Sequence, residues 1–261
     1  MRKVISKDGT PIAFDQSGEG PALILVGGAF QHRAIDPSTA QLAALLSQHF
    51  CVFHYDRRGR GDSGDTRPYA VEREVQDLEA LIKEAGGSAF VFGMSSGAVL
   101  ALKAAARGLA ITKLALYEPP FNLDDSARSA SENYAKQLTA LLAEGRRGDA
   151  VALAMTTWGA PAEAIAGMRQ TPIWSTFESV APTLAYDNAI MGDGSVPAND
   201  AKAVKVPTLV LDGGNSPTFM RYAADALAKV LSNAHRRTLE GQTHDVAPEA
   251  LAPVLGEFFA R

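Results

Sequence analysis

Short apolar runs alternate along the chain with segments whose apolar residues recur at helical spacing. The runs that predict strands cover residues 12–15, 22–26, 51–55, 89–92, 111–117, 208–211 and 236–239. Between them, spacings of three and four, as at Val71, Val75, Leu78 and Ile82, predict helices. Such alternation is typical of a mostly parallel sheet covered by helices on both faces, so we predict an α/β fold.

Residues 121–204 break this alternation, because helical patterns dominate there and no clear strand is present. We therefore predict a helical cap over 121–204, inserted between two strands of a core made of 1–120 and 205–261. The large apolar residues of this segment are Met155, Trp158, Trp174 and Phe177. We expect some of them to face a substrate pocket, although such residues also often form the core of a cap.

Two proline pairs predict where helices begin. In Asp36-Pro37 and in Ser216-Pro217, a residue type favoured at the N-cap precedes a proline suited to the first helical turn. We expect Asp36 and Ser216 to cap the helices that follow them.

Composition narrows the class of protein. The 261 residues include 25 Lys and Arg against 29 Asp and Glu, a net charge of -4, and 46% are hydrophobic. This balance gives no electrostatic attraction to nucleic acid or to an anionic membrane, and no apolar run is long enough to span one. The single cysteine, Cys51, cannot form an internal disulfide, and no signal peptide is visible, so we expect a cytoplasmic protein.

The segment Gly93-Met94-Ser95-Ser96-Gly97 fits the pattern G-x-S-x-G, directly after a predicted strand and before a predicted helix. A nucleophile elbow requires this context, because the turn is too sharp for bulky neighbours and lifts the serine off the sheet at a helix N-terminus. We predict that Ser95 is a nucleophile. A plain strand-to-helix turn is the structural alternative.

His244 lies in the last loop between a predicted strand and the final helix. Such loops gather at the carboxyl edge of a doubly wound sheet, where the elbow also lies. We predict that His244 is the general base for Ser95, although a lone loop histidine is usually structural. The other four histidines show no metal-ligand spacing, and we expect neither metal nor cofactor.

The loop Gly27-Gly28-Ala29-Phe30 follows the strand at 22–26. We predict that the backbone amide of Ala29 in this loop and the backbone amide of Ser96 together form an oxyanion hole. The glycines also suit a tight turn, and the two interpretations are compatible.

These segments and the polar loop 56–64 resemble segments of the α/β-hydrolase superfamily and occur in the same order along the chain. Together they span nearly the whole chain outside the cap. Loop 56–64 is similar to the family's D-x-R-G-x-G-x-S segment, which mainly builds scaffold. The resemblance implies an eight-stranded sheet, a cap between strands 6 and 7 over the active site, and acyl-enzyme chemistry on esters, lactones, thioesters or related bonds. One departure is Gly27, which stands where many relatives have histidine before the oxyanion-loop glycine.

The second departure concerns the triad acid. Relatives usually carry it just past the penultimate strand, where this chain has Ser216. We predict Glu118 instead, because it ends the strand at 111–117 and some relatives place their acid there. Asp212 is the alternative, and a capping or salt-bridging carboxylate is the structural explanation for Glu118. A Glu118 oxygen should lie about 2.6–3.2 Å from a His244 ring nitrogen.

The sequence thus favours a serine hydrolase acting on an ester, lactone or related acyl bond of a small, partly apolar molecule. Dehalogenases and epoxide hydrolases use a carboxylate nucleophile, so Ser95 argues against both. Cofactor-free perhydrolysis remains an alternative that the same triad can support. A non-catalytic small-molecule receptor on the same fold is another, because fold alone does not determine function.

Overall fold

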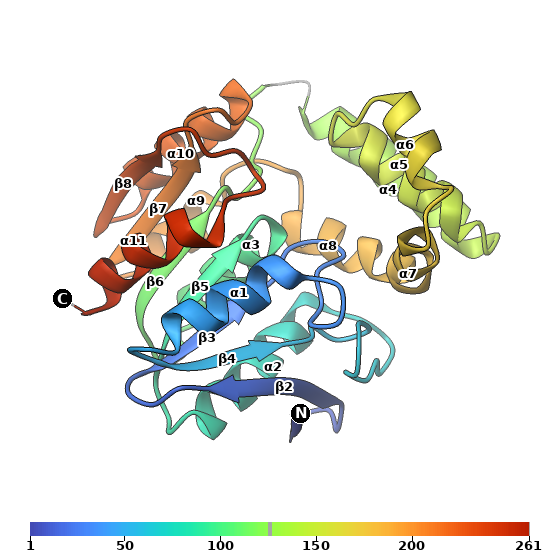
Figure 1. The fold of residues 1–261 in the computed structure, drawn as a ribbon. Coiled ribbons are helices and arrows are strands. Elements are labelled where there is room, and N and C mark those ends of the chain that lie inside the picture. The colour runs from blue at the N-terminus through green and yellow to red at the C-terminus, as the bar shows by residue number, and fades with distance from the viewer. Residues whose placement is uncertain (125–126, 261) are drawn as a thin grey trace.

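The centre of the protein is an eight-stranded sheet within residues 1–124 and 127–260, which the computed structural model describes. The strand order is β1-β2-β4-β3-β5-β6-β7-β8 (Figure 1). The strands are β1 (Arg2–Ile5), β2 (Pro11–Ser17), β3 (Ala22–Val26), β4 (Cys51–Tyr55), β5 (Ala89–Met94), β6 (Ile111–Tyr117), β7 (Thr208–Gly213) and β8 (Ala234–Leu239). The pairs β1/β2 and β2/β4 are antiparallel and the others parallel, which confirms the predicted mostly parallel sheet.

Helices cover both faces of this sheet. They are α1 (Pro37–Leu46), α2 (Val71–Glu84), α3 (Ser96–Ala106), α10 (Thr218–Val230) and α11 (Pro248–Ala260). Alternate residues of β3 point to opposite faces, so Ile24 and Val26 join the apolar cluster of α2, α3 and α10, whereas Leu23 and Leu25 join that of α1 and α11. Burial on both faces explains why the parallel strands are continuous apolar runs.

The N-terminal edge strand β1 was not predicted. Of its four residues only Val4 is buried, so no apolar run marks it, and it is held by antiparallel pairing with β2. An edge strand of this kind is determined by its neighbour in the sheet rather than by its own pattern.

The two predictions of helix starts have different outcomes. The Asp36 side chain accepts a hydrogen bond from the Thr39 amide at the start of α1, as expected (3.0 Å). The prediction for Ser216 is wrong, because α10 begins one residue later, with Pro217 at the N-cap and no capping side chain. Ser216 is instead buried beside β7.

The described residues of 121–204 contain helices and no strand. The helices are α4 (Ala127–Ala143), α5 (Arg147–Thr157), α6 (Ala162–Met168), α7 (Ile173–Val180), the 3-10 turn η1 (Ala181–Thr183), α8 (Leu184–Met191) and α9 (Ala198–Ala203). Helices α4–α7 share an apolar cluster, which also includes Phe30 of the loop after β3 and Leu184 at the start of α8. These four helices stand apart from the sheet in Figure 1. Ile190 of α8 and Ala201 of α9 instead join the cluster of α2, α3 and α10. The insertion therefore divides by packing near the start of α8.

No helix in the described part of the chain is both long enough and apolar enough to cross a membrane.

Candidate active site

Ser95 lies at the sharp turn between β5 and α3. Its backbone angles, φ 55° and ψ −126°, are outside the regions that most residues adopt. A Cβ atom on Gly93 would lie 2.6 Å from the Gly97 carbonyl oxygen, and one on Gly97 would lie 2.3 Å from the Val26 oxygen. Both glycines are thus required by close backbone approach, and Ser95 sits at the N-terminus of α3, where negative charge is favoured.

Glu118 and His244 meet at the carboxyl edge of the sheet. Glu118 directly follows β6 with a positive φ of 45°, and its side chain is fully buried. Its Oε2 lies 2.7 Å from His244 Nδ1, within the range expected from the sequence, and its Oε1 accepts from the Gly213 amide at 2.8 Å. His244 comes from the loop between β8 and α11, and its side chain is 35% exposed.

The environment of Glu118 keeps it ionised. Burial raises the pKa of this carboxyl, but its hydrogen bonds, including those with His244 and the Gly213 amide, outweigh burial, so the pKa is lowered. An ionised Glu118 accepts a hydrogen bond from the protonated Nδ1 of His244. This assignment leaves Nε2 as the ring nitrogen able to accept a proton from elsewhere.

The alternative acid, Asp212, is occupied by another partner. It is fully buried at the end of β7, and its two oxygens accept from Nε and Nη2 of Arg236, both at 2.9 Å. Thr238 donates a third hydrogen bond to it at 3.1 Å. Asp212 therefore balances the charge of an arginine on β8, while Glu118 contacts the histidine.

The loop after β3 packs directly against the nucleophile, because a Cβ on Gly28 would lie 3.0 Å from Cβ of Ser95. The Gly28 amide donates to the Gln31 side chain. The amides of Ala29 and Ser96 have no hydrogen-bond acceptor among the described residues, which leaves both available to a substrate oxygen.

Aromatic residues join this loop to the inserted helices. Phe30, with a positive φ of 62°, packs against Trp158 at 5.5 Å and against Phe177 at 4.8 Å between ring centroids. The other two large apolar residues singled out in the sequence, Met155 and Trp174, are buried within the cluster of α4–α7. Trp158 and Phe177 thus make ring contacts with Phe30, the residue next to Ala29.

Residues 23–254 match the model of the alpha/beta hydrolase family. The chain belongs to this family. A solved structure of an α/β-hydrolase from Sphaerobacter thermophilus is 56% identical with a TM-score of 0.90, covering 99% of this chain and 100% of the other. An esterase from Thermogutta terrifontis is 23% identical with a TM-score of 0.73 (99% and 97% covered). The enol-lactonase of Burkholderia xenovorans is 22% identical with a TM-score of 0.69 (100% of both chains).

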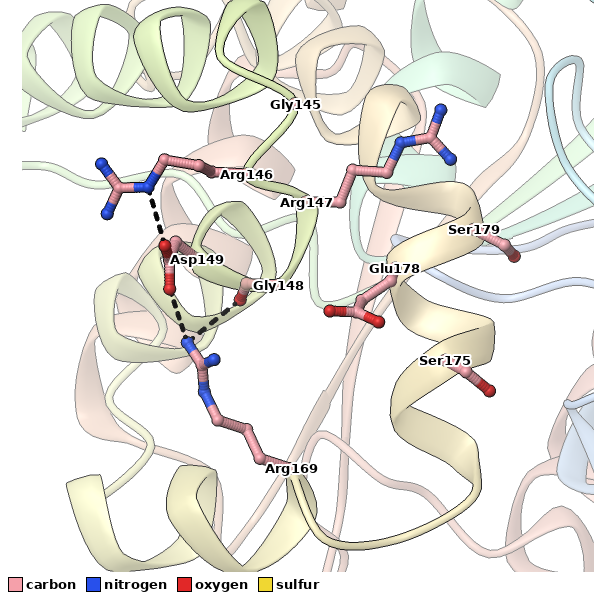
Figure 2. A pocket seen from close by; sticks show the side chains of 9 residues that line it. All are labelled: Gly145, Arg146, Arg147, Gly148, Asp149, Arg169, Ser175, Glu178 and Ser179. Atoms are coloured by element: carbon pink, nitrogen blue, oxygen red, sulfur yellow. Dashed lines mark hydrogen bonds and ion pairs between the residues drawn. The ribbon is translucent and has the colours of Figure 1, made fainter.

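A polar depression lies on the inserted helices of this α/β-hydrolase (Figure 2). It is lined by Gly145, Arg146, Arg147, Gly148, Asp149, Arg169, Ser175, Glu178 and Ser179. Arg146 and Arg169 both pair with Asp149, at 2.8 and 2.9 Å. None of Ser95, Glu118 and His244 lines it, so we do not assign acyl chemistry to it.

Sequence reasoning missed a group of buried charges beside the loop that follows β3 of the α/β-hydrolase. Arg57 and Arg60 of the loop after β4 contact the carbonyl groups of Gly27 and Gly28, and both arginines also contact Asp187 on α8. The resemblance implies only a scaffold role for the polar loop 56–64. The available signal was its three arginines, which need acidic partners if the loop is buried.

Proposed function

We propose that this α/β-hydrolase is a serine hydrolase that cleaves an ester, lactone or related acyl bond through an acyl-enzyme. The observation that carries the proposal is the 2.7 Å contact between His244 and the fully buried Glu118, at the same sheet edge as the strained Ser95 turn. Nucleophile, orienting acid and base follow one another along the chain as Ser95, Glu118 and His244, which is the order of this fold's triads.

In the proposed mechanism His244 Nε2 removes the proton of Ser95 Oγ as this oxygen attacks the acyl carbon. The negative charge that develops on the carbonyl oxygen is stabilised by the amides of Ala29 and Ser96. The imidazolium, stabilised by Glu118, then protonates the leaving group, and the acyl group stays on Ser95. Water, activated by the same His244, hydrolyses this ester and restores the serine.

The surroundings support a small, partly apolar substrate. Phe30 directly follows the proposed oxyanion donor Ala29, and its ring packs with Trp158 and Phe177. We propose that helices α4–α7 form a cap and that this aromatic group lines the substrate side. A serine nucleophile argues against dehalogenase or epoxide hydrolase chemistry. The scheme uses only the chain's own residues, and we propose that it operates in the cytoplasm, in keeping with the single cysteine, Cys51.

The test combines a panel of acyl esters and lactones of varied chain length with labelling by a fluorophosphonate probe. We expect hydrolysis of at least one substrate class and labelling at Ser95. Ser95→Ala should abolish labelling and reduce turnover on the order of a millionfold while the protein stays folded. A folded wild-type protein that neither labels nor hydrolyses any member of the panel, yet binds such molecules, would instead be a receptor.

A further inference from the structure

Two buried arginines hold the carbonyl side of the proposed oxyanion loop. Arg57 Nη1 donates to the Gly27 carbonyl at 3.3 Å, and Arg60 Nη1 donates to the Gly28 carbonyl. Each arginine is only 1% exposed. Substrate therefore does not reach either guanidinium, and any effect on the reaction passes through the loop.

One carboxylate joins these arginines to the nucleophile elbow. Asp187 Oδ1 accepts from Arg57 Nη1 at 2.8 Å and from Ser96 Oγ at 2.7 Å. Its Oδ2 accepts from Arg60 Nη2 at 2.6 Å. Asp187 belongs to α8, so a single side chain from the insertion fixes Arg60 and also the first residue of α3.

The charges of this group balance. Arg57 also pairs with Glu74, at 2.8 and 3.0 Å, so two arginines face two carboxylates. Burial of four charges is tolerated because each is paired and hydrogen bonded. Such a rigid, water-excluded group suits the fixing of a backbone segment.

The contact with Gly28 determines the direction of the Ala29 amide. A trans peptide unit is planar, and its C=O and N–H point to opposite sides. The Gly28 carbonyl and the Ala29 amide belong to the same unit, so a carbonyl held toward Arg60 directs the Ala29 N–H away from Arg60. A cation on the carbonyl oxygen also polarises the unit and makes the amide a stronger donor.

We propose that Arg60, held in place by Asp187, is a positioning residue that orients and polarises the Gly28–Ala29 peptide so that the Ala29 amide stabilises the oxyanion. The inference rests on the proposed serine hydrolase function. It also connects both donors, because the carboxylate that holds Arg60 binds the Ser96 side chain.

Arg58 provides a matched control in the same loop. It is equally buried, and it donates to Asp77 at 2.8 and 2.7 Å, to Asp8 at 2.9 Å and to the Arg73 carbonyl at 3.2 Å. None of these partners belongs to the oxyanion loop or to the elbow. A purely structural role for a buried arginine predicts the same outcome at both positions.

The experiment compares Arg60→Lys with Arg58→Lys. For Arg60→Lys we expect kcat to fall about 10- to 100-fold with KM within about threefold, less than the loss for removal of a whole donor. The affinity for a trifluoromethyl ketone, which forms an oxyanion on Ser95, should fall by the same factor. Arg58→Lys should lower Tm to a similar extent but leave kcat within about threefold.

A second variant covers the possibility that Arg60→Lys does not fold. Ser96→Ala removes only the hydroxyl, which donates to Asp187 at 2.7 Å and accepts from Arg57 Nη1 at 3.3 Å, and it keeps the Ser96 amide, so the fold should persist. We expect kcat to fall about 3- to 10-fold with KM unchanged, as for loss of the hydrogen bond to Asp187. Equal losses of kcat in Arg60→Lys and Arg58→Lys, or an unchanged kcat in a folded Arg60→Lys or in Ser96→Ala, would overturn the inference.

Amide NMR separates this inference from the proposed function. The Ala29 amide proton should shift in Arg60→Lys and stay unchanged in Arg58→Lys, whether or not any substrate is hydrolysed. An inactive and unlabelled wild-type protein would contradict the serine hydrolase proposal. An Ala29 resonance that does not respond to Arg60→Lys would contradict the positioning role, even in an active enzyme.

Discussion

Replacing Glu118 with glutamine keeps the shape of the side chain and removes its charge. In Glu118→Gln the amide oxygen can still accept from the Gly213 amide, as Oε1 does now at 2.8 Å. The amide NH2 then faces His244 Nδ1, which lies 2.7 Å from Oε2 in the native protein. Since a donor now faces Nδ1, that nitrogen must become an acceptor and the ring proton moves to Nε2.

This tautomer cannot accept the Ser95 proton, so we expect kcat to fall by about 10⁴, as for other triads that lose the acid's charge. The stability of Glu118→Gln should be affected less severely than its activity. A hydrogen bond to a charged group contributes about 1.5–3 kcal/mol, which for a chain of this size lowers Tm by roughly 3–12 °C. The protein should stay folded at room temperature.

The assay measures kcat and KM on the best ester of the substrate panel, with circular dichroism to monitor folding. Asp212→Asn is the matched control, because Asp212 is also fully buried and ends the neighbouring strand but pairs with Arg236. It should lower Tm and leave kcat within about threefold. Retention of more than about a tenth of kcat by Glu118→Gln would refute the reasoning, and a 10⁴-fold loss in Asp212→Asn alone would transfer the acid's role to Asp212.

Three further predictions concern the elbow, the aromatic contact and pH. Gly97→Ala should fail to fold or lose all activity, because its Cβ would lie 2.3 Å from a carbonyl oxygen. Gly167→Ala is the control, because a Cβ at this position of α6 meets open space, and it should change Tm by no more than a few degrees and leave activity intact. Phe30→Ala should lower the free energy of unfolding, measured with urea, by about 3 kcal/mol. Trp158→Ala should lower it by under about 1 kcal/mol, because Trp158 is 53% exposed. Equal losses in the two variants would contradict the packing described above. The pKa of Glu118 is lowered from 4.5, so its ionised form stabilises the fold fully above that pH, and this contribution is lost as pH falls through the lowered pKa. The difference in unfolding free energy between wild type and Glu118→Gln should therefore be constant above about pH 5 and shrink on acidification; a difference that grows instead would show that the sign is wrong.

The local pattern of residues along the sequence determines many of the strands and turns of this protein. Strands buried on both faces, such as β3, are continuous apolar runs, so the sequence predicts them together with the α/β sheet they form. The turn at Ser95 is local at Gly93, whose Cβ would meet Gly97 and Ala98, whereas Gly97 is required by the carbonyl of Val26 in the adjacent strand β3. The apolar runs and the requirement for Gly93 are predictable because the physical cause and the residues lie in the same short segment.

Only the tertiary structure determines which charged side chains pair with one another. Glu118 and Asp212 end neighbouring parallel strands, so the sequence places both at one edge of the sheet and leaves both possible as the acid. Arg236, one strand further along, binds Asp212 and leaves Glu118 for His244, 126 residues away. The pairing of Arg60 with Asp187 spans 127 residues. A buried charge is stabilised only by a partner at hydrogen-bond distance, and long-range packing alone determines which of the many carboxylates in the chain reaches it.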